Sequence, residues 1–341
     1  MPWFKDLTGF REETPAQVRQ NLAVDGAYIV SLVNGNRYKY GALAIPKLQD
    51  LRDTVDIKEY QGTLQISEFI GDVQQIHLFP HSKKALIQAA SQFNLLEMVG
   101  PNITPEQGVG KYEYDRTQGP ACAIACGAGT IYRNYFVEVN GESGQTKDNQ
   151  IDCLSEYDKL WDNPNRQLWT MQNGYALANK DGLNFITQYI QNLSKSEYEH
   201  LKGLLKIGIQ WDTQVTLDEV EGYSKETPEN ELHTVSQIYC SALPVAYSHV
   251  RPPQLWEAFA RLVLDATYEA TFYAALQNYR KTGNNIVYLT LVGGGAFGNE
   301  RPWILDAIKK SIEKFQYTPL DVRIVSYKWS NPNVKRFLNS L

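Results

Sequence analysis

The sequence predicts an α/β fold with a mainly parallel β-sheet, and three observations support this. Apolar segments of strand length alternate with segments of helical period along most of the 341 residues. Several of these strands end in turn-forming residues, and no repeat or low-complexity tract interrupts the alternation. Strands separated by helices form βα units, which give a parallel sheet whose ligands bind at the carboxyl ends of the strands.

The expected elements follow in chain order. Strands are expected over residues 27–33, 63–70, 85–90, 169–178, 207–217, 235–239, 285–292 and 322–327. Helices are expected within 41–54 and over 121–136, 182–193, 194–204, 254–281 and 303–315. The loop over 97–120 is longer than most connections in compact domains and is therefore expected to be functional or disordered. A charged loop is expected at 218–231.

Composition and charge exclude several classes of protein. A hydrophobic fraction of 43% supports a full core, and a formal net charge of −5 argues against a general nucleic-acid binder. No apolar run approaches the roughly 20 residues that span a bilayer, so no membrane association is expected. The N-terminal MPWFKD does not resemble a signal peptide, and a cytoplasmic location is therefore expected.

The four cysteines do not indicate a disulfide framework or a metal site. Cys122 and Cys126 are four residues apart on an expected helix, but no second pair of ligands follows them. We expect no metal and no cofactor, and we expect the cysteines to be small buried packing residues.

A glycine turn after the strand at 285–292 is the most informative local pattern. It consists of Gly293, Gly294, Gly295, Ala296, Phe297, Gly298 and Asn299. Glycines allow positive φ angles and leave consecutive amides free to face a ligand, and the following helix adds its positive N-terminal end. This combination suits a diphosphate, although an ordinary tight turn between strand and helix gives the same sequence.

Three further motifs precede this turn. Gly71-Asp72-Val73 ends one strand, Ala90-Ser91-Gln92-Phe93-Asn94 ends the next, and Gln118-Gly119-Pro120 opens a helix of small residues. With the glycine turn, their order resembles the macrodomain superfamily over about residues 60–327. The resemblance implies a three-layer α/β/α fold with a mixed, mainly parallel sheet and an ADP-ribose site at the strand ends.

Within that superfamily the long acidic first loop is more reminiscent of the poly-ADP-ribose glycohydrolases. The ensemble also looks like the bacterial effector MavL and its relatives, which remove ADP-ribose from arginine of ubiquitin. Residues 1–60 lie outside the shared core, so the expected division is an N-terminal extension over 1–60 and an ADP-ribose-binding domain over 61–341.

The resemblance also assigns roles to residues. Asp72 with Val73 would receive the adenine amino group, Asn94 would contact the distal ribose, and Tyr327 would stack near adenine. The segments 118–120 and 293–299 would hold the diphosphate. Each residue also has a plainer interpretation, because Asp72 can cap a turn or helix, Asn94 can close a strand, and Phe297 can belong to the core.

Cleaving an ADP-ribosyl bond would require carboxyl groups near the distal ribose. The reaction passes through an oxocarbenium-like species and needs an acid or a base, with negative charge close by. Asp115 and Glu113 are the first candidates beside Asn94, and Glu97 is a further candidate. A solvated acidic loop is the alternative, and Arg116 either pairs with Asp115 or helps to hold phosphate.

The sequence therefore predicts an ADP-ribosyl hydrolase acting on modified protein side chains, with arginine and ubiquitin as candidate targets. The alternative is a non-catalytic reader of ADP-ribose or a related NAD-derived nucleotide, which has no need of an acidic loop. A serine hydrolase is disfavoured because no Gly-x-Ser-x-Gly motif occurs. A dinucleotide oxidoreductase is disfavoured because the glycine turn lies near the C-terminus.

Overall fold

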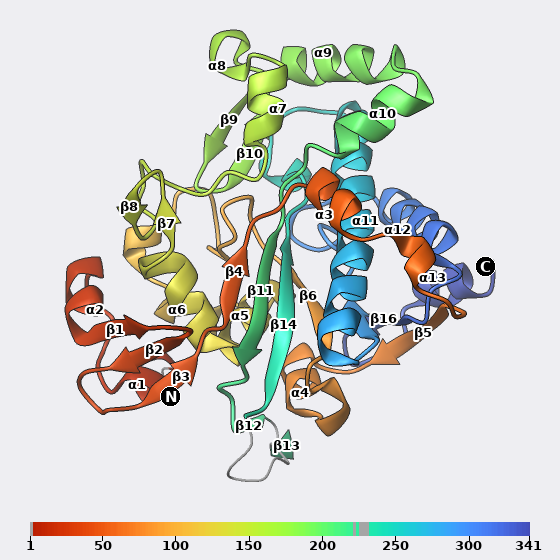
Figure 1. The fold of residues 1–341 in the computed structure, drawn as a ribbon. Coiled ribbons are helices and arrows are strands. Elements are labelled where there is room, and N and C mark those ends of the chain that lie inside the picture. The colour runs from red at the N-terminus through yellow and green to blue at the C-terminus, as the bar shows by residue number, and fades with distance from the viewer. Residues whose placement is uncertain (1–2, 221–222, 225–231) are drawn as a thin grey trace.

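A seven-stranded mixed sheet forms the centre of the described part of the chain (Figure 1). The computed structural model describes residues 3–220, 223–224 and 232–341, so most of the charged loop expected at 218–231 lies outside the described residues. The strand order is β4 (Ala42–Ala44), β11 (Gly208–Gln214), β14 (Thr234–Cys240), β6 (Leu86–Ala90), β15 (Ile286–Leu289), β16 (Asp321–Ser326) and β5 (Gln65–Ile70).

The sheet is mainly parallel, as predicted. The five strands from β14 to β5 run parallel to one another, whereas β11 pairs antiparallel with both of its neighbours. Parallel strands end at the same edge of a sheet, so Cys240, Ala90, Leu289, Ser326 and Ile70 mark a common carboxyl edge.

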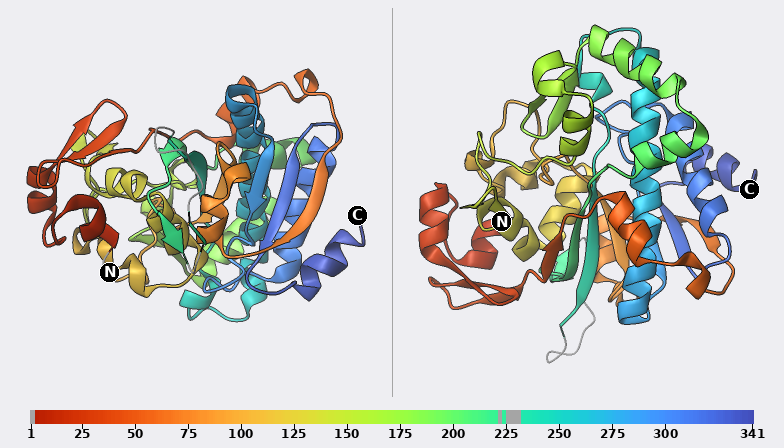
Figure 2. Two further views of the ribbon diagram at one scale, coloured as in Figure 1. Left: turned by 90° about the horizontal axis from the view of Figure 1, so that it is seen from below. Right: turned by 45° about the horizontal axis from the view of Figure 1, so that its top comes forward.

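Helices cover both faces of this sheet (Figures 1 and 2). Gln88 on β6 donates to Thr271 on α11 (Glu257–Thr282), at 2.9 Å. Gln237 on β14, the register partner of Ile87, donates instead to the Cys122 carbonyl on α5 (Gln118–Ala125). Since successive residues of a strand face opposite sides, α11 and α5 lie on opposite faces. The predicted three layers are therefore present.

Ion pairs as well as apolar packing hold together the helices on the α11 side of the sheet. It contains α3 (Leu48–Thr54), α9 (Lys180–Gln191), α10 (Lys195–Lys202) and α12 (Arg301–Phe315). Glu269 on α11 is almost fully buried and pairs with Arg52 at 2.7 Å, with Lys202 at 2.7 Å and with Lys314 at 2.5 Å. Removal of one partner would leave charge buried without compensation, so this network fixes α3, α10 and α12 on α11.

Residues 1–60 divide between the main sheet and a smaller unit. α1 (Trp3–Thr8), α2 (Pro15–Asn21) and the three-stranded antiparallel sheet β1 (Leu22–Asp25), β2 (Tyr28–Ser31) and β3 (Arg37–Lys39) pack against α6 (Gly127–Tyr135). β4 and α3 instead join the main sheet and its helical layer.

Two expected elements differ from those observed. The helix expected over 121–136 is broken at Cys126, between α5 and α6, where Gly127 leaves room for Trp3. The strand expected over 169–178 is a hairpin of β9 (Trp169–Gln172) and β10 (Tyr175–Ala178). Its Asn173-Gly174 turn has positive φ at both residues, which is the geometry that joins antiparallel strands most tightly.

The remaining helices and strands include α4 (Val73–Leu78), which packs beside α5 with Ile76 and His77 fully buried. The others are β7 (Glu138–Val139), β8 (Glu142–Ser143), α7 (Ser155–Leu160), α8 (Asn163–Arg166), β12 (Glu219–Val220), β13 (Tyr223–Ser224) and α13 (Pro332–Leu338). Short 3-10 helices are η1 (Ile57–Glu59), η2 (Pro80–Ser82), η3 (Pro105–Gln107), η4 (Gly110–Tyr114), η5 (Val245–Tyr247) and η6 (Pro253–Trp256). Within the described ranges, no helix is long and apolar enough to cross a membrane.

Candidate active site

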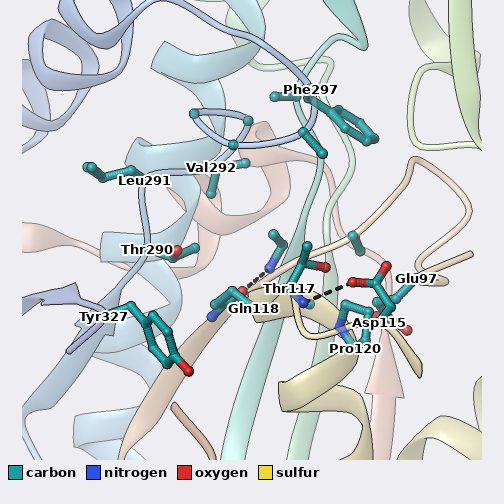
Figure 3. A pocket seen from close by; sticks show the side chains of 18 of the residues that line it. Glu97, Asp115, Thr117, Gln118, Pro120, Thr290, Leu291, Val292, Phe297 and Tyr327 are labelled. Carbon is teal, nitrogen blue, oxygen red and sulfur yellow. Dashed lines mark hydrogen bonds between the residues drawn. The ribbon is translucent and has the colours of Figure 1, made fainter. Parts of the chain in front are cut away.

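A cavity of about 1150 Å³ opens at the carboxyl edge of the parallel strands (Figure 3). Four chain segments build most of its wall: residues 90–99 after β6, residues 111–120 leading into α5, residues 290–297 after β15, and residues 325–333 after β16. The volume slightly exceeds the usual range for small-molecule sites, so the cavity has room for a ligand of dinucleotide size.

The glycine turn forms one side of this cavity. The hydroxyl of Tyr268 on α11 donates to the Thr290 carbonyl at 2.7 Å and accepts the Val292 amide at 2.9 Å, which fixes the chain as it leaves β15. Gly293 then adopts a φ of 74°, and a Cβ there would lie 2.4 Å from the Cβ of Ala242. Only glycine fits this position.

The turn leaves backbone donors unused. The Gly294 amide bonds to the Leu291 carbonyl at 2.9 Å, and the Gly298 and Asn299 amides bond to carbonyls of the turn at 3.0 and 2.9 Å. In the part of the chain that the structure describes, the amides of residues 295–297 donate to no acceptor. Three consecutive free amides at a cavity wall are suited to an anion.

An arginine without an ion pair among the described residues lies beside the glycine turn. Arg301, the first residue of α12, lines the cavity and forms no hydrogen bond or ion pair with any described residue. The N-terminus of a helix repels positive charge, so an unpaired arginine there is unfavourable unless an anion lies between them. Lys111 and Arg116 also line the cavity without an ion pair among the described residues.

The opposite side of the cavity begins with a close contact between α5 and β6. The Gln118 side chain accepts the Ala90 amide and donates to the Gln88 carbonyl, both at 2.8 Å. A Cβ on Gly119 would lie 2.0 Å from the Ala90 carbonyl oxygen, so the first turn of α5 approaches β6 as only glycine permits. Asp115 accepts the Thr117 amide at 2.9 Å and fixes the turn into α5.

Glu97 is the most unusual group in this wall. The residue is only 2% exposed, and neither carboxyl oxygen has a hydrogen-bond partner among the described residues. Burial raises the pKa of Glu97 to about 8, although Arg133, with its Nη2 atom 3.5 Å from the Glu97 Oε1 atom, and the Tyr112 hydroxyl both lower it. The raised pKa favours the protonated form of Glu97 near neutral pH, the form that can act as an acid.

Arg133 is held behind Glu97 by other contacts. It is fully buried, its Nε donates to the Leu95 carbonyl at 3.1 Å, and its guanidinium lies 3.6 Å from the ring centroid of Tyr239. These contacts keep the cation close to Glu97, while both buried carboxyl oxygens form no hydrogen bond with a described residue.

Three aromatic rings connect the two sides of the cavity. Phe297 of the glycine turn lies 5.2 Å from Tyr175 and 5.5 Å from Tyr247, measured between ring centroids. The Tyr175 hydroxyl donates to the Met98 carbonyl at 2.7 Å, immediately after Glu97. Sequence reasoning missed Tyr175, Tyr247 and Arg301. Only Arg301 carried a local signal, as a cation directly after the glycine turn.

The structure brings most of the predicted binding residues together. The predicted residues that line the cavity are Asp115, Gln118, Gly119, Pro120, Gly293, Gly294, Gly295, Ala296, Phe297 and Tyr327. Figure 3 shows Glu97 and Asp115 on one side of the cavity and Tyr327 on the other. Glu113 does not line it and lies on η4.

Asp72, Val73 and Asn94 lie outside the lining, each for a local reason. Asp72 accepts the Gln74 amide at 2.8 Å as the N-cap of α4, and Val73 is buried. Their turn still adjoins the wall, because the Gly71 amide donates to the Ser326 carbonyl. Asn94 is fully buried, donates to Gln150 at 2.8 Å and accepts the Leu96 amide at 3.1 Å.

Gly298 and Asn299 close the base of the glycine turn. Gly298 has a φ of 72°, and a Cβ on it would lie 2.8 Å from the Cβ of Ala246. Asn299 is buried and donates to the Leu243 carbonyl at 2.8 Å. Both residues shape the turn from behind the cavity.

The described residues contain no group of three or more His, Cys, Asp or Glu side chains arranged to hold a metal ion. All four cysteines are buried and free. The site therefore consists of carboxyl groups, cations, aromatic rings and backbone amides.

Comparison with known proteins gives likeness in structure only. No protein-family model and no curated protein sequence matches the chain. A poly(ADP-ribose) glycohydrolase from Deinococcus radiodurans, solved with ADP-ribose, is 13% identical with a TM-score of 0.46, covering 97% of this chain and 99% of that chain. The enzyme from Thermomonospora curvata, solved with the inhibitor ADP-HPD, is 10% identical with a TM-score of 0.45, covering 96% and 97%.

Proposed function

We propose that this protein is an ADP-ribosyl hydrolase that binds ADP-ribose in the cavity at the carboxyl edge of its sheet. The observation that carries the proposal is a buried carboxyl group without a hydrogen-bond partner, Glu97, in the wall of a cavity whose other side offers free amides and an arginine without an ion pair among the described residues. One side suits a diphosphate, and the other suits cleavage of a glycosidic bond.

The diphosphate would lie on the glycine turn. The amides of residues 295–297 have no acceptor among the described residues and would donate to phosphate oxygens. The positive charge of Arg301 would balance the charge of the diphosphate. The adenosine would extend toward Tyr327, a residue that is 59% exposed and whose ring lies beneath the Lys328 ammonium at 5.0 Å, so an adenine would stack on its other face. The distal ribose would then lie on the side of Glu97 and Asp115.

Hydrolysis would use the two carboxyl groups differently. Glu97, protonated at neutral pH, would donate its proton to the leaving group as the anomeric bond breaks. The Asp115 carboxylate would stabilise the developing positive charge or accept a proton from the attacking water. Different environments for two carboxyl groups are the usual basis of such a division of roles.

We extend the proposal to the bond that is cleaved and to the protein that carries the ADP-ribose. Arginine-linked ADP-ribose is the linkage to test first, with ubiquitin among the carriers. The cytoplasmic location also stays a prediction.

Two measurements test the proposed function. Isothermal titration with ADP-ribose should show binding, with AMP binding more weakly because it lacks the second phosphate and the distal ribose. ADP-ribose release should then be measured from proteins modified at arginine, glutamate and serine, and from the polymer. Absence of binding at millimolar ADP-ribose would contradict the proposal, whereas binding without release from any substrate would support a reader instead.

A further inference from the structure

Glu12 lies in the connection between α1 and α2. Its carboxyl group accepts three hydrogen bonds from residues that are distant in the sequence. Its carboxyl oxygens accept the Val109 amide at 2.9 Å, the Gly110 amide at 2.6 Å and the Tyr135 hydroxyl at 2.6 Å. Two adjacent backbone amides and a tyrosine hydroxyl converging on one carboxylate form a built anion site, and the protein fills it with its own side chain.

The local sequence leaves space for this carboxylate. A Cβ on Gly108 would lie 2.4 Å from the Glu12 Oε2 atom, and a Cβ on Gly110 would lie 2.7 Å from the same atom. Gly108 also has a φ of 85°, a conformation that other residues rarely adopt. Both glycines are therefore explained by Glu12, although about a hundred residues separate them from it.

The anchored segment leads directly to the acidic side of the cavity. Gly110 is the first residue of η4, and η4 carries Tyr112. The buried Tyr112 hydroxyl accepts the Glu97 amide at 2.9 Å. Asp115 is the C-cap of η4 and begins the turn into α5. One continuous set of contacts therefore runs from Glu12 to the backbone of Glu97 and of Asp115, the two residues that carry the carboxyl groups of the candidate site.

The diphosphate side meets this set of contacts only at its far end, where Tyr175 donates to the Met98 carbonyl and its ring lies 5.2 Å from that of Phe297. The segment 290–297 is fixed by Tyr268 and by its own turn. A disturbance at Glu12 should therefore act mainly on Glu97 and Asp115 and only weakly on the amides of residues 295–297.

We propose that Glu12 is a positioning residue for the reaction, through which the N-terminal segment sets the placement of Glu97 and Asp115. The inference rests on the proposed function for its chemical consequence. Its structural part, that Glu12 holds residues 108–115, stands on the hydrogen bonds alone.

The test compares Glu12→Gln with Glu13→Gln, an exposed neighbour whose side chain has no partner among the described residues. The amide of glutamine keeps the shape but offers one acceptor atom where the carboxylate offers two. Glu12→Gln should lower kcat about 10-fold, because small misplacements of catalytic groups are costly. The ADP-ribose dissociation constant should stay within about twofold of the wild-type value. A fall in kcat with unchanged binding indicates that an interaction made only in the transition state has been lost.

Limited trypsin digestion gives a readout that does not depend on activity. Lys111 and Arg116 lie within or beside the anchored segment and are exposed, so Glu12→Gln should speed cleavage at these two residues while Glu13→Gln should not. If Glu12→Gln destabilises the whole fold, Tyr135→Phe removes only one of the three hydrogen bonds and should show the same pattern more weakly.

Each result has a definite meaning. Unchanged kcat and unchanged cleavage in Glu12→Gln would overturn the inference, as would ADP-ribose affinity that falls in step with kcat. If the wild type binds ADP-ribose but releases it from no substrate, the proposed function fails while the trypsin result still decides whether Glu12 holds the segment.

Discussion

The two sides of the cavity are built by different means. The diphosphate side comes from one short segment, residues 290–301, whose glycines, free amides and arginine are adjacent in sequence. The acidic side depends on residues distant in the chain. Tyr112 and Arg133 contact Glu97, and Glu12 holds the first residue of η4, the element that carries Tyr112. Local sequence therefore builds the side proposed to bind the diphosphate, while tertiary contacts build the side proposed to carry the chemistry.

The largest expected effect is a loss of hydrolysis, without a loss of ADP-ribose binding, in the Glu97→Gln variant. Glu97→Gln replaces the acidic proton with an amide of nearly equal shape, so hydrolysis should fall at least about 100-fold, the usual contribution of a general acid. ADP-ribose binding should persist, because the glycine turn is unchanged. Initial rates and isothermal titration on the same preparation check both, with exposed Glu138→Gln as the control. Retained hydrolysis would rule out Glu97 as the acid.

A change on the diphosphate side should have the opposite pattern. Gly293→Ala forces a residue with a Cβ into a φ of 74° and against Ala242, so ADP-ribose affinity should fall at least about 10-fold and the Tm should drop. Gly295→Ala is the matched variant, because its φ is not in the left-handed region and a Cβ there meets nothing within 4 Å. It should keep the Tm of the wild type. Equal Tm values for both variants would contradict the described turn.

Arg301 tests the electrostatic part of the diphosphate side. Arg301→Gln should weaken ADP-ribose binding by about 10-fold, in line with loss of one charge-assisted hydrogen bond. The difference from wild type should shrink as salt is raised, since the cavity is open to solvent. Titrations at low and high salt measure this, with Arg280→Gln on the exposed end of α11 as the control. A salt-independent loss would indicate a structural role instead.

The last prediction concerns the dependence of stability on pH. Burial raises the pKa of Glu97 to about 8 in the folded protein, whereas the unfolded chain has the ordinary value. The folded state thus holds an extra proton, and the stability linked to it is fully present below the unfolded pKa and is lost as pH rises toward 8. Between pH 5 and 8, the free energy of unfolding of wild type should fall relative to Glu97→Gln, by at most about 1.4 kcal/mol per pH unit. Urea denaturation at several pH values checks this, and parallel curves would contradict the raised pKa.

The same contrast explains what the sequence could predict. The sheet class and the turn at 293–299 follow from periodicity and from a glycine run, both of which are local signals. The hairpin at 169–178 was predicted as one strand, although its Asn173-Gly174 pair is a local turn signal. The break at Cys126 had no such signal, because it depends on Trp3 packing against Gly127.

The acidic side was predictable only as a region. Glu97 stood as one candidate among several, because its distinction comes from burial behind Arg133 and Tyr112 and not from its neighbours in sequence. Asn94 has the right position after β6, but the left-handed φ of 64° at Leu95 and the bond to Gln150 give it a buried structural role. Residue type and order along the chain do not show which polar side chains are hydrogen-bonded within the fold and which can contact a ligand.

The central claim is that ADP-ribose binds across both sides, with its diphosphate on the glycine turn. Amide chemical shifts of Gly295, Ala296 and Phe297, followed during titration with ADP-ribose, test it most directly. These amides should shift downfield together as the ligand saturates, and AMP should shift them less. Saturation with ADP-ribose that leaves all three amides unmoved, or no saturation at millimolar concentration, would contradict the account.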